Sequence, residues 1–127
     1  MMRYLIDTDV MVDVSRRSAG AATYVDSLDD VAISIITAHE LIVGARNRRD
    51  ADGIDNLIRT FPVHADLHAQ ITNLAYDLLK RYAKSDGLRT FDALIAATAI
   101  AEGLTLVSRN HKHFRMIGEL HLEIPDY

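Results

Sequence analysis

The sequence contains no cysteine, no tryptophan and only two prolines among its 127 residues. Without cysteine, the chain forms neither disulfide bonds nor thiolate metal sites. Few prolines, with 49% hydrophobic and 25% charged residues, are typical of a globular chain rather than a disordered one. A chain of this length fits one domain, so we expect a single domain over residues 1–127.

Long apolar runs are also missing. Asp7 interrupts the first apolar stretch far short of the hydrophobic region of a signal peptide. The longest later run, Ala93–Ala101, is too short to cross a bilayer. Together these absences predict a cytoplasmic protein without membrane association.

The chain has no excess of positive charge, because its formal net charge is −4. The field of the whole molecule would therefore repel nucleic acid at long range, which disfavours simple electrostatic binding of DNA or RNA. An enzyme that meets phosphate through a metal ion and local basic residues stays compatible with this charge. Basic residues do form clusters, each more often a solvated face than a binding patch: Arg16–Arg17, Arg46 with Arg48–Arg49, Lys80–Arg81 with Lys84, and Arg109 with Lys112 and Arg115.

What the sequence does contain is a series of short apolar segments alternating with helical patterns. Strands are predicted at Tyr4–Ile6, Val31–Ile35, Thr105–Val107 and Leu122–Ile124, with a short extended piece at Phe61–Val63. Helices are predicted at Thr8–Ser15, Ala19–Leu28, Thr37–Asn47, Ala51–Thr60, Asp66–Lys84 and Phe91–Glu102. The segment HKHF at residues 111–114 is predicted to be a loop or turn. This alternation indicates an α/β three-layer sandwich, with a short, mainly parallel sheet flanked by helices.

Acids and an amide occupy the positions where the predicted strands end. Asp7 ends the first predicted strand, and Asn110 follows the predicted strand Thr105–Val107. Glu40 and Asp92 lie in the first turns of two predicted helices. In parallel α/β sheets, ligands bind beyond the carboxyl ends of the strands. These four positions are therefore candidates for one shared site.

Each acid also has a local structural explanation. Thr37 and Glu40 form a T-x-x-E capping box, in which Glu40 would bond the backbone N–H of Thr37. Thr90 is a candidate N-cap, and the helix dipole would favour Asp92 just after it. Asp7 would cap the first helix. Taken one at a time, these explanations are the more common ones.

Taken together, the acids favour a site. Three carboxylates at one sheet edge would repel by about 4 kcal/mol per pair at a separation of about 4 Å. Bound protons, a basic side chain or a divalent cation would have to neutralise them. A hard cation such as Mg²⁺ takes oxygen ligands, which suits metal-assisted hydrolysis of phosphodiesters.

Four segments carry a resemblance to a known family: YLIDTDVMVD, ITAHELIVGA, TFDALIAATAIAEGLTLVSRN and HKHF. In this order and combination the sequence resembles the PIN-domain ribonucleases, and among them the VapC toxins of bacterial and archaeal toxin–antitoxin pairs. The resemblance extends over essentially the whole chain.

The resemblance implies that Asp7, Glu40 and Asp92 hold Mg²⁺ or Mn²⁺ and position the attacking water. The fourth acidic position of many PIN domains is Asn110 here, an uncharged amide that can still contact phosphate or a metal-bound water. Its neutrality puts tight binding of a second metal in doubt. We therefore predict a catalytic set of these four residues.

The resemblance further implies an RNA substrate, a small antitoxin protein that blocks the site, and a homodimer. Asp9 would support the site without being one of its three core acids, and Ser108 could hydrogen-bond to it.

Two alternatives stay open. The spacing of Asp7 and Asp9 superficially matches a haloacid dehalogenase-type phosphatase, with Asp7 as nucleophile and Asp9 as general acid. That family also needs a downstream lysine and a later acidic pair on a larger frame. Alternatively, the neutral Asn110 indicates a PIN-like binding module that has lost its activity.

Among the six histidines, His64 and His68 are four apart, but we predict surface or satisfied side chains rather than zinc ligands.

Overall fold

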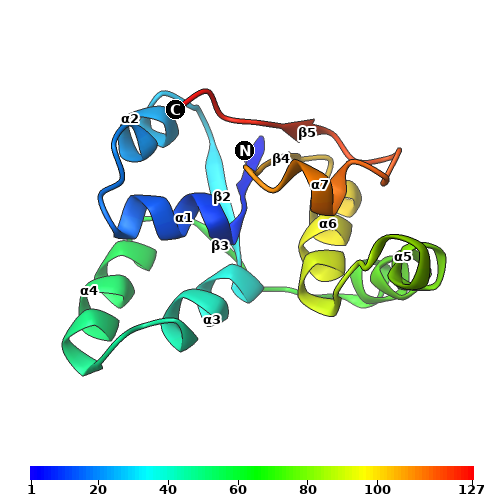
Figure 1. The fold of residues 1–127 in the computed structure, drawn as a ribbon, viewed down its shortest axis with the longest axis horizontal. Helices are drawn as coiled ribbons and strands as arrows, with labels where there is room; N and C mark the ends of the chain where they lie inside the picture. Colours follow the sequence, from blue (N-terminus) through cyan, green and yellow to red (C-terminus); the bar gives the residue numbers. More distant parts are fainter.

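A parallel five-stranded sheet forms the centre of the computed structural model, which describes residues 1–127 (Figure 1). The strands are β1 (Tyr4–Ile6), β2 (Val31–Ser34), β3 (Val63–His64), β4 (Thr105–Val107) and β5 (Leu122–Glu123). They lie in the order β3-β2-β1-β4-β5, and each adjacent pair is parallel. The predicted α/β class with a mainly parallel sheet is confirmed.

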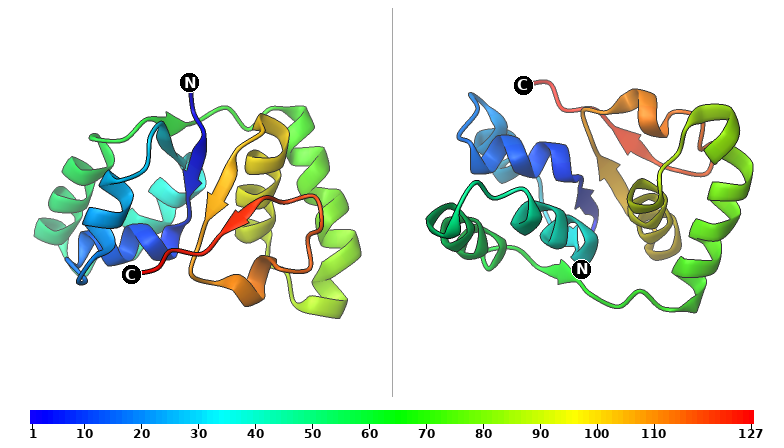
Figure 2. Two further views of the ribbon diagram at one scale, coloured as in Figure 1. Left: turned by 90° about the horizontal axis from the view of Figure 1, so that it is seen from above. Right: turned by 60° about the horizontal axis from the view of Figure 1, so that its bottom comes forward.

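Seven helices flank this sheet on both sides. They are α1 (Thr8–Ser15), α2 (Ala21–Asp26), α3 (Ile35–Val43), α4 (Arg48–Ile58), α5 (Ala69–Asp86), α6 (Thr90–Glu102) and α7 (His111–Phe114). The views in Figure 2 place α5 and α6 on one side of the sheet and α1 to α4 on the other. None of the helices is both long enough and apolar enough to span a lipid bilayer.

Alternate strand residues divide the core into two parts, because successive side chains of a strand point to opposite faces. One face packs against α5 and α6 through fully buried residues of three strands: Leu5, Ala32 and Leu106. The residues that follow them in sequence pack against α1, α3 and α4 on the other face: Ile6, Ile33 and Val107. The result is the predicted three-layer arrangement, with β1 in the middle of the sheet.

The start of α3 differs from the prediction. β2 stops at Ser34 rather than Ile35, and α3 begins at Ile35 rather than Thr37. The Ser34 side chain is the N-cap and accepts a hydrogen bond from the backbone N–H of Ile36. The predicted capping box at Thr37 and Glu40 is therefore wrong, which frees the Glu40 carboxylate from the helix terminus.

Other element boundaries also move. α4 begins at Arg48 rather than Ala51, because Asn47 accepts from the N–H of Asp50. Arg89, not Thr90, occupies the N-cap position of α6, without a side-chain capping bond. α5 begins and ends later than predicted, α2 is shorter, and HKHF forms the short helix α7 instead of a loop or turn.

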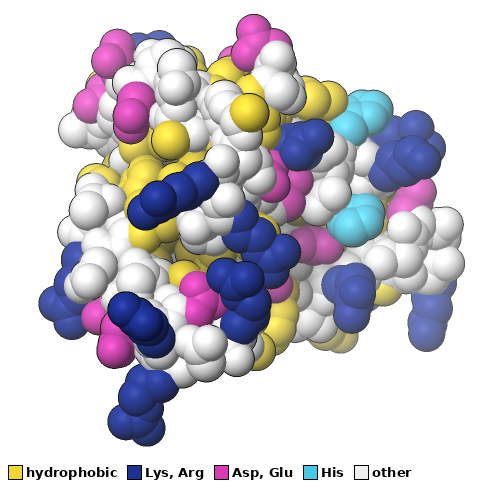
Figure 3. All heavy atoms as spheres, turned by 60° about the vertical axis from the view of Figure 1, so that its left-hand side comes forward, with side chains coloured by type: hydrophobic (Ala, Val, Ile, Leu, Met, Phe, Trp, Pro, Cys, Tyr) yellow, Lys and Arg dark blue, Asp and Glu magenta, His cyan; other side chains and the backbone are white.

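The surface carries its charge unevenly. Figure 3 shows the molecule from the side that carries α1, α2 and α4, where Lys and Arg side chains gather across the middle and lower part of the face. Acidic side chains lie between them. The negative net charge of the chain therefore does not describe this side of the molecule.

Candidate active site

Asp7 lies where the central strand β1 passes into α1. Its side chain is only 3% exposed. The carboxylate makes no capping hydrogen bond to α1 and instead accepts one from the Ser108 hydroxyl, at 2.8 Å. Its backbone N–H donates to Val107 O, so the end of β4 fixes Asp7 on both sides. Asp7 thus occupies the N-cap position of α1, as its local explanation requires, but its side chain forms no capping bond there.

Burial raises the pKa of the Asp7 carboxyl to about 8. The nearby charge of Asp9 contributes to this increase in the pKa, whereas the hydrogen bond from Ser108 opposes it. In the absence of a cation, the Asp7 carboxyl is thus mainly protonated at neutral pH.

Asp9 joins the start of α1 to the segment after β4. Its carboxylate accepts from the backbone N–H of Arg109 at 2.9 Å, and burial raises its pKa. The N–H of Asn110 in turn donates to the Ser108 hydroxyl at 3.0 Å. Asn110 is therefore held at the edge of the same site, with its side chain exposed.

Glu40 approaches this place from α3. Thr8 Oγ1 donates to Glu40 Oε1 at 2.7 Å, and the hydroxyls of Thr8 and Thr37 lie 3.0 Å apart. Glu40 is thus oriented by a hydroxyl of α1 rather than by its own helix terminus.

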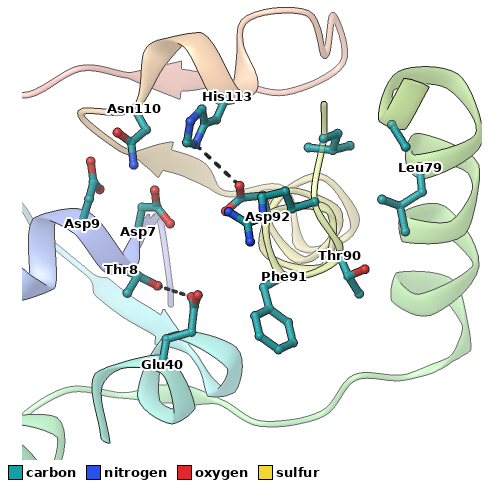
Figure 4. Close-up of a pocket in the computed structure, with 13 residues that line it drawn as sticks. Asp7, Thr8, Asp9, Glu40, Leu79, Thr90, Phe91, Asp92, Asn110 and His113 are labelled. Carbon is teal, nitrogen blue, oxygen red and sulfur yellow. Dashed lines mark hydrogen bonds and ion pairs between the residues drawn. The ribbon is translucent and has the colours of Figure 1, made fainter. Parts of the chain in front are cut away.

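Asp92 lies in the first turn of α6, as predicted, and points toward α7. His113 Nδ1 is 3.6 Å from Asp92 Oδ2 (Figure 4). Burial raises the pKa of Asp92, the charge of His113 opposes this shift, and Glu40 adds to it. The interaction with Glu40 indicates that the two carboxylates experience each other across the site.

The acidic side chains described above, together with Thr8, Asn110 and His113, line one open cleft of about 810 Å³ (Figure 4). The four predicted site residues, Asp7, Glu40, Asp92 and Asn110, are among them. Asp9 adds a fourth carboxylate, and the remaining wall combines basic and apolar residues: Arg89, His113, Leu79 and Phe91. The structure therefore brings together residues that are far apart in sequence, while their catalytic roles stay predictions.

Carboxylate and amide oxygens are the donors that Mg²⁺ and Mn²⁺ prefer, so the residues of the cleft fit a hard divalent cation. As placed, however, no three histidine, aspartate or glutamate side chains converge as they would around a bound ion. The hydroxyls of Ser108 and Thr8 occupy oxygens of Asp7 and Glu40 instead. The donor set fits, and binding would require these side chains to turn toward a common point.

Two histidines outside the cleft share one acidic partner. His64 and His68 both approach Glu102, with Nε2 to Oε1 distances of 3.5 and 2.8 Å. His64 Nδ1 is buried without a hydrogen-bond partner, so the expectation of a satisfied side chain is wrong at this atom.

Thr8, Arg89 and His113 line the cleft but were not among the predicted site residues. Thr8 stands between Asp7 and Asp9, so its place beside the first acid was a usable signal. The contact of His113 with Asp92 depends on α7, which the sequence did not reveal as a helix.

A model of the family described as PIN domain matches residues 4–120. This chain belongs to the PIN-domain family. Two similar relatives from Mycobacterium tuberculosis are named Ribonuclease VapC10 and Ribonuclease VapC19. The first is 32% identical to this PIN domain over 120 residues, which is 91% of this chain and 89% of the relative. The second is 31% identical over 121 residues, which is 91% of this chain and 95% of the relative.

Solved structures similar to this PIN domain come from toxin–antitoxin complexes. VapBC2 from Rickettsia felis, bound to a promoter DNA fragment, gives a TM-score of 0.83 at 27% identity, with 97% of this chain and 98% of that chain covered. A toxin–antitoxin complex from Klebsiella pneumoniae gives 0.78 at 28% identity, with 92% and 94% covered. Membership of the PIN family excludes the haloacid dehalogenase-type phosphatase considered for Asp7 and Asp9.

Proposed function

We propose that this PIN domain is a divalent-metal-dependent endoribonuclease, the toxin of a toxin–antitoxin pair. The names of its relatives, Ribonuclease VapC10 and VapC19, support the activity, and the toxin–antitoxin structures support the biological setting. One observation carries the proposal: carboxylates from three distant parts of the chain, Asp7, Glu40 and Asp92, line one open cleft.

In this proposal Asp7, Glu40 and Asp92 hold Mg²⁺ or Mn²⁺ through their carboxylate oxygens. A bound divalent cation supplies positive charge next to the phosphate and makes a water molecule more acidic. Ser108 and Thr8 position two of the carboxylates, because each hydroxyl donates to one of them. Burial of Asp7 and Asp9 keeps their charge from being dispersed by bulk water, which strengthens their interaction with a cation.

The amide of Asn110 is assigned a different task from the three acids. It carries no charge, so it adds little to the affinity for a second cation. Its N–H groups can donate to a phosphate oxygen without the repulsion that a carboxylate would cause. Arg89, which also lines the cleft, supplies positive charge on the same side as Asp92, and His113 lies beside that carboxylate.

The test is cleavage of single-stranded RNA by purified Asp7→Asn and Asp92→Asn variants. Removing even a residue that supports a metal ligand typically lowers activity or affinity by about 10- to 100-fold, so loss of a ligand should lower the cleavage rate by at least about 100-fold. Asp26→Asn, an exposed acid of α2, is the matched control and should cleave like the wild type. EDTA should stop cleavage, and Mg²⁺ or Mn²⁺ should restore it.

Undiminished cleavage by both variants would contradict the assigned ligands. Intact RNA after long incubation of the wild type with Mg²⁺ or Mn²⁺, together with no cation binding by calorimetry, would favour the inactive binding module instead.

We also propose an antitoxin partner and a homodimer. The structural relatives that are toxin–antitoxin complexes support the first. Large apolar side chains on the surface support a self-contact, since Val43 is 85% exposed and Ile42 41% exposed at the end of α3. An RNA substrate would place the activity in the cytoplasm. Light scattering on the purified protein measures the mass, and a monomer at micromolar concentration would contradict the dimer.

A further inference from the structure

Two smaller hollows lie beside the acidic cleft, and arginines line both. The larger, of about 500 Å³, is lined by Arg17, Arg46 and Arg49, between the end of α1 and the start of α4. The smaller, of about 60 Å³, is lined by Arg16 and again by Arg46. We call these four residues the arginine track.

The track is continuous with the acidic cleft. Glu40 lines both the cleft and the small hollow. The small and the larger hollow share Arg46, Asp50 and Ser15 as lining residues, so they lie next to one another. A ligand that leaves the cleft past Glu40 therefore meets Arg16 and Arg46 first, and Arg17 and Arg49 beyond them.

Most of the positive charge on this track has no protein partner. Arg46 forms an ion pair with Asp50, with Nε to Oδ2 at 3.5 Å. Arg16, Arg17 and Arg49 are exposed and take part in no ion pair. Arg16 and Arg17, just after α1, and Arg49, at the start of α4, thus present guanidinium groups without an ion pair beside the acidic cleft. Figure 3 shows basic side chains gathered on the side of the molecule that carries α1 and α4.

Arg17 also stands in a conformation that disfavours its own side chain. Its φ of 57° is in the left-handed region, where glycine is preferred. An arginine here costs stability relative to glycine, typically about 1 kcal/mol or more. Folding alone gives no reason for arginine at this position.

We propose that the arginine track binds the backbone phosphates of single-stranded RNA next to the scissile bond. The inference rests on the proposed ribonuclease function and assigns the part of the substrate that lies outside the cleft. Arginine matches phosphate geometry with two parallel N–H donors. A flexible single strand can follow a path that bends from the cleft past Glu40, whereas a duplex is stiff. The observations favour RNA over an acidic protein because the track continues directly into the cleft that would hold the reacting phosphate.

The experiment measures binding and cleavage by the double variant Arg17→Gln/Arg49→Gln. Binding of a labelled 12-nucleotide single-stranded RNA is followed in EDTA, so that it does not depend on cleavage. Each lost phosphate contact lowers the slope of log affinity against log salt by about 0.7 for single strands. Loss of two contacts should lower the slope by about 1.4 and weaken binding by about 10- to 30-fold at 0.1 M salt. With Mg²⁺ or Mn²⁺, KM should rise by a similar factor while kcat stays within about twofold.

Three controls define the result. Arg3→Gln/Lys80→Gln removes the same charge from exposed residues outside all three hollows and should bind like the wild type. Arg17→Lys/Arg49→Lys should retain the salt slope, because the charges remain. Arg17→Gly should keep or raise the melting temperature while weakening RNA binding, which separates the contact from folding.

An unchanged salt slope and an unchanged affinity in the double variant would overturn the inference, whatever the wild type cleaves. An equal loss of RNA affinity in Arg17→Gln/Arg49→Gln and in the control Arg3→Gln/Lys80→Gln would also overturn the inference, since the change in net charge alone would explain it. If the double variant lost affinity for polyglutamate but not for RNA, the track would be a protein-binding surface and the inference would be wrong. A failure of the wild type to cleave RNA would count against the ribonuclease proposal alone, because the binding measurement is independent of it.

Discussion

Asp7 combines an ionisable side chain with almost complete burial. It is a buried acid at the end of the central strand β1, and one hydroxyl, that of Ser108, donates to its side chain. Because burial raises its pKa to about 8, the folded protein keeps the proton that the unfolded chain releases near the ordinary pKa of 3.8. The folded state therefore binds more protons between these values, and the stability of the cation-free protein falls as the pH rises from about 4 to 8.

We predict that Asp7→Asn removes this dependence. An amide needs no proton to stay neutral, so the variant should be more stable than the wild type in EDTA at pH 7.5 and similar to it at pH 4.5. The slope that disappears is at most about 1.4 kcal/mol per pH unit. Urea unfolding at both pH values measures it, with Asp26→Asn as the control. A variant with the same slope as the wild type would show that Asp7 is ionised in the folded protein.

At the scale of an element, the start of α3 shows how a cap directs a functional side chain. Ser34 is fully buried and ends β2, and its hydroxyl accepts from the N–H of Ile36. The helix therefore starts early enough to carry Glu40 past its first turn. There the carboxylate is free to contact Thr8 of α1.

We predict that Ser34→Ala destabilises the fold by about 1 kcal/mol, and by up to about 2 kcal/mol because the N–H of Ile36 loses its partner in a buried place. Ser27→Ala, at an exposed hydroxyl that donates to Tyr24 O, is the matched control and should change stability by less than about 0.5 kcal/mol. Urea midpoints compare the two. Equal midpoints would contradict the role of Ser34 as the cap.

The elements were predictable where a single signal dominated. The apolar runs Tyr4–Ile6 and Thr105–Val107 form β1 and β4 at the predicted residues. The start of α3 was not predictable in this way, because Ser34 and Thr37 are both good caps. Where β2 ends decides between them, and this depends on the pairing of Ser34 with His64 of β3.

The start of α4 could have been read from the sequence. Asn47 accepts from the N–H of Asp50, as an N-cap does, and Asp50 accepts from the N–H of Arg46, the residue before the cap. An asparagine followed three residues later by an acid is a usable signal for a helix start. The membership of Asp7, Glu40 and Asp92 in one cleft was predictable from strand ends. Their partners Thr8 and His113 were not, because those contacts depend on how α1, α3, α6 and α7 pack.

At the scale of the whole molecule, charge is separated rather than balanced. Four carboxylates line the cleft, and the arginine track begins next to it. A divalent cation should relieve the repulsion within the cleft and release the proton of Asp7. Binding to the folded state alone stabilises it by about 2.7 kcal/mol at a concentration of 100 times Kd.

We therefore predict that Mg²⁺ or Mn²⁺ raises the melting temperature of the wild type and that EDTA reverses the increase. The rise should vanish in Asp7→Asn/Asp92→Asn, because two of the three proposed ligands are gone. Thermal unfolding at constant ionic strength, with Na⁺ in place of the divalent ion as the control, measures the effect. An equal rise in the double variant would assign the cation to another site.

The strand order has a consequence for the chain during its synthesis. β1 is made well before its neighbour β4, and the hydrogen bond between Asp7 and Ser108 joins residues 101 positions apart in the chain. Asn110 and His113, which also line the cleft, follow Ser108. No early fragment contains the complete cleft, and no local peptide can imitate it. A growing polypeptide therefore lacks the complete cleft until Ser108, Asn110 and His113 have emerged and folded against β1.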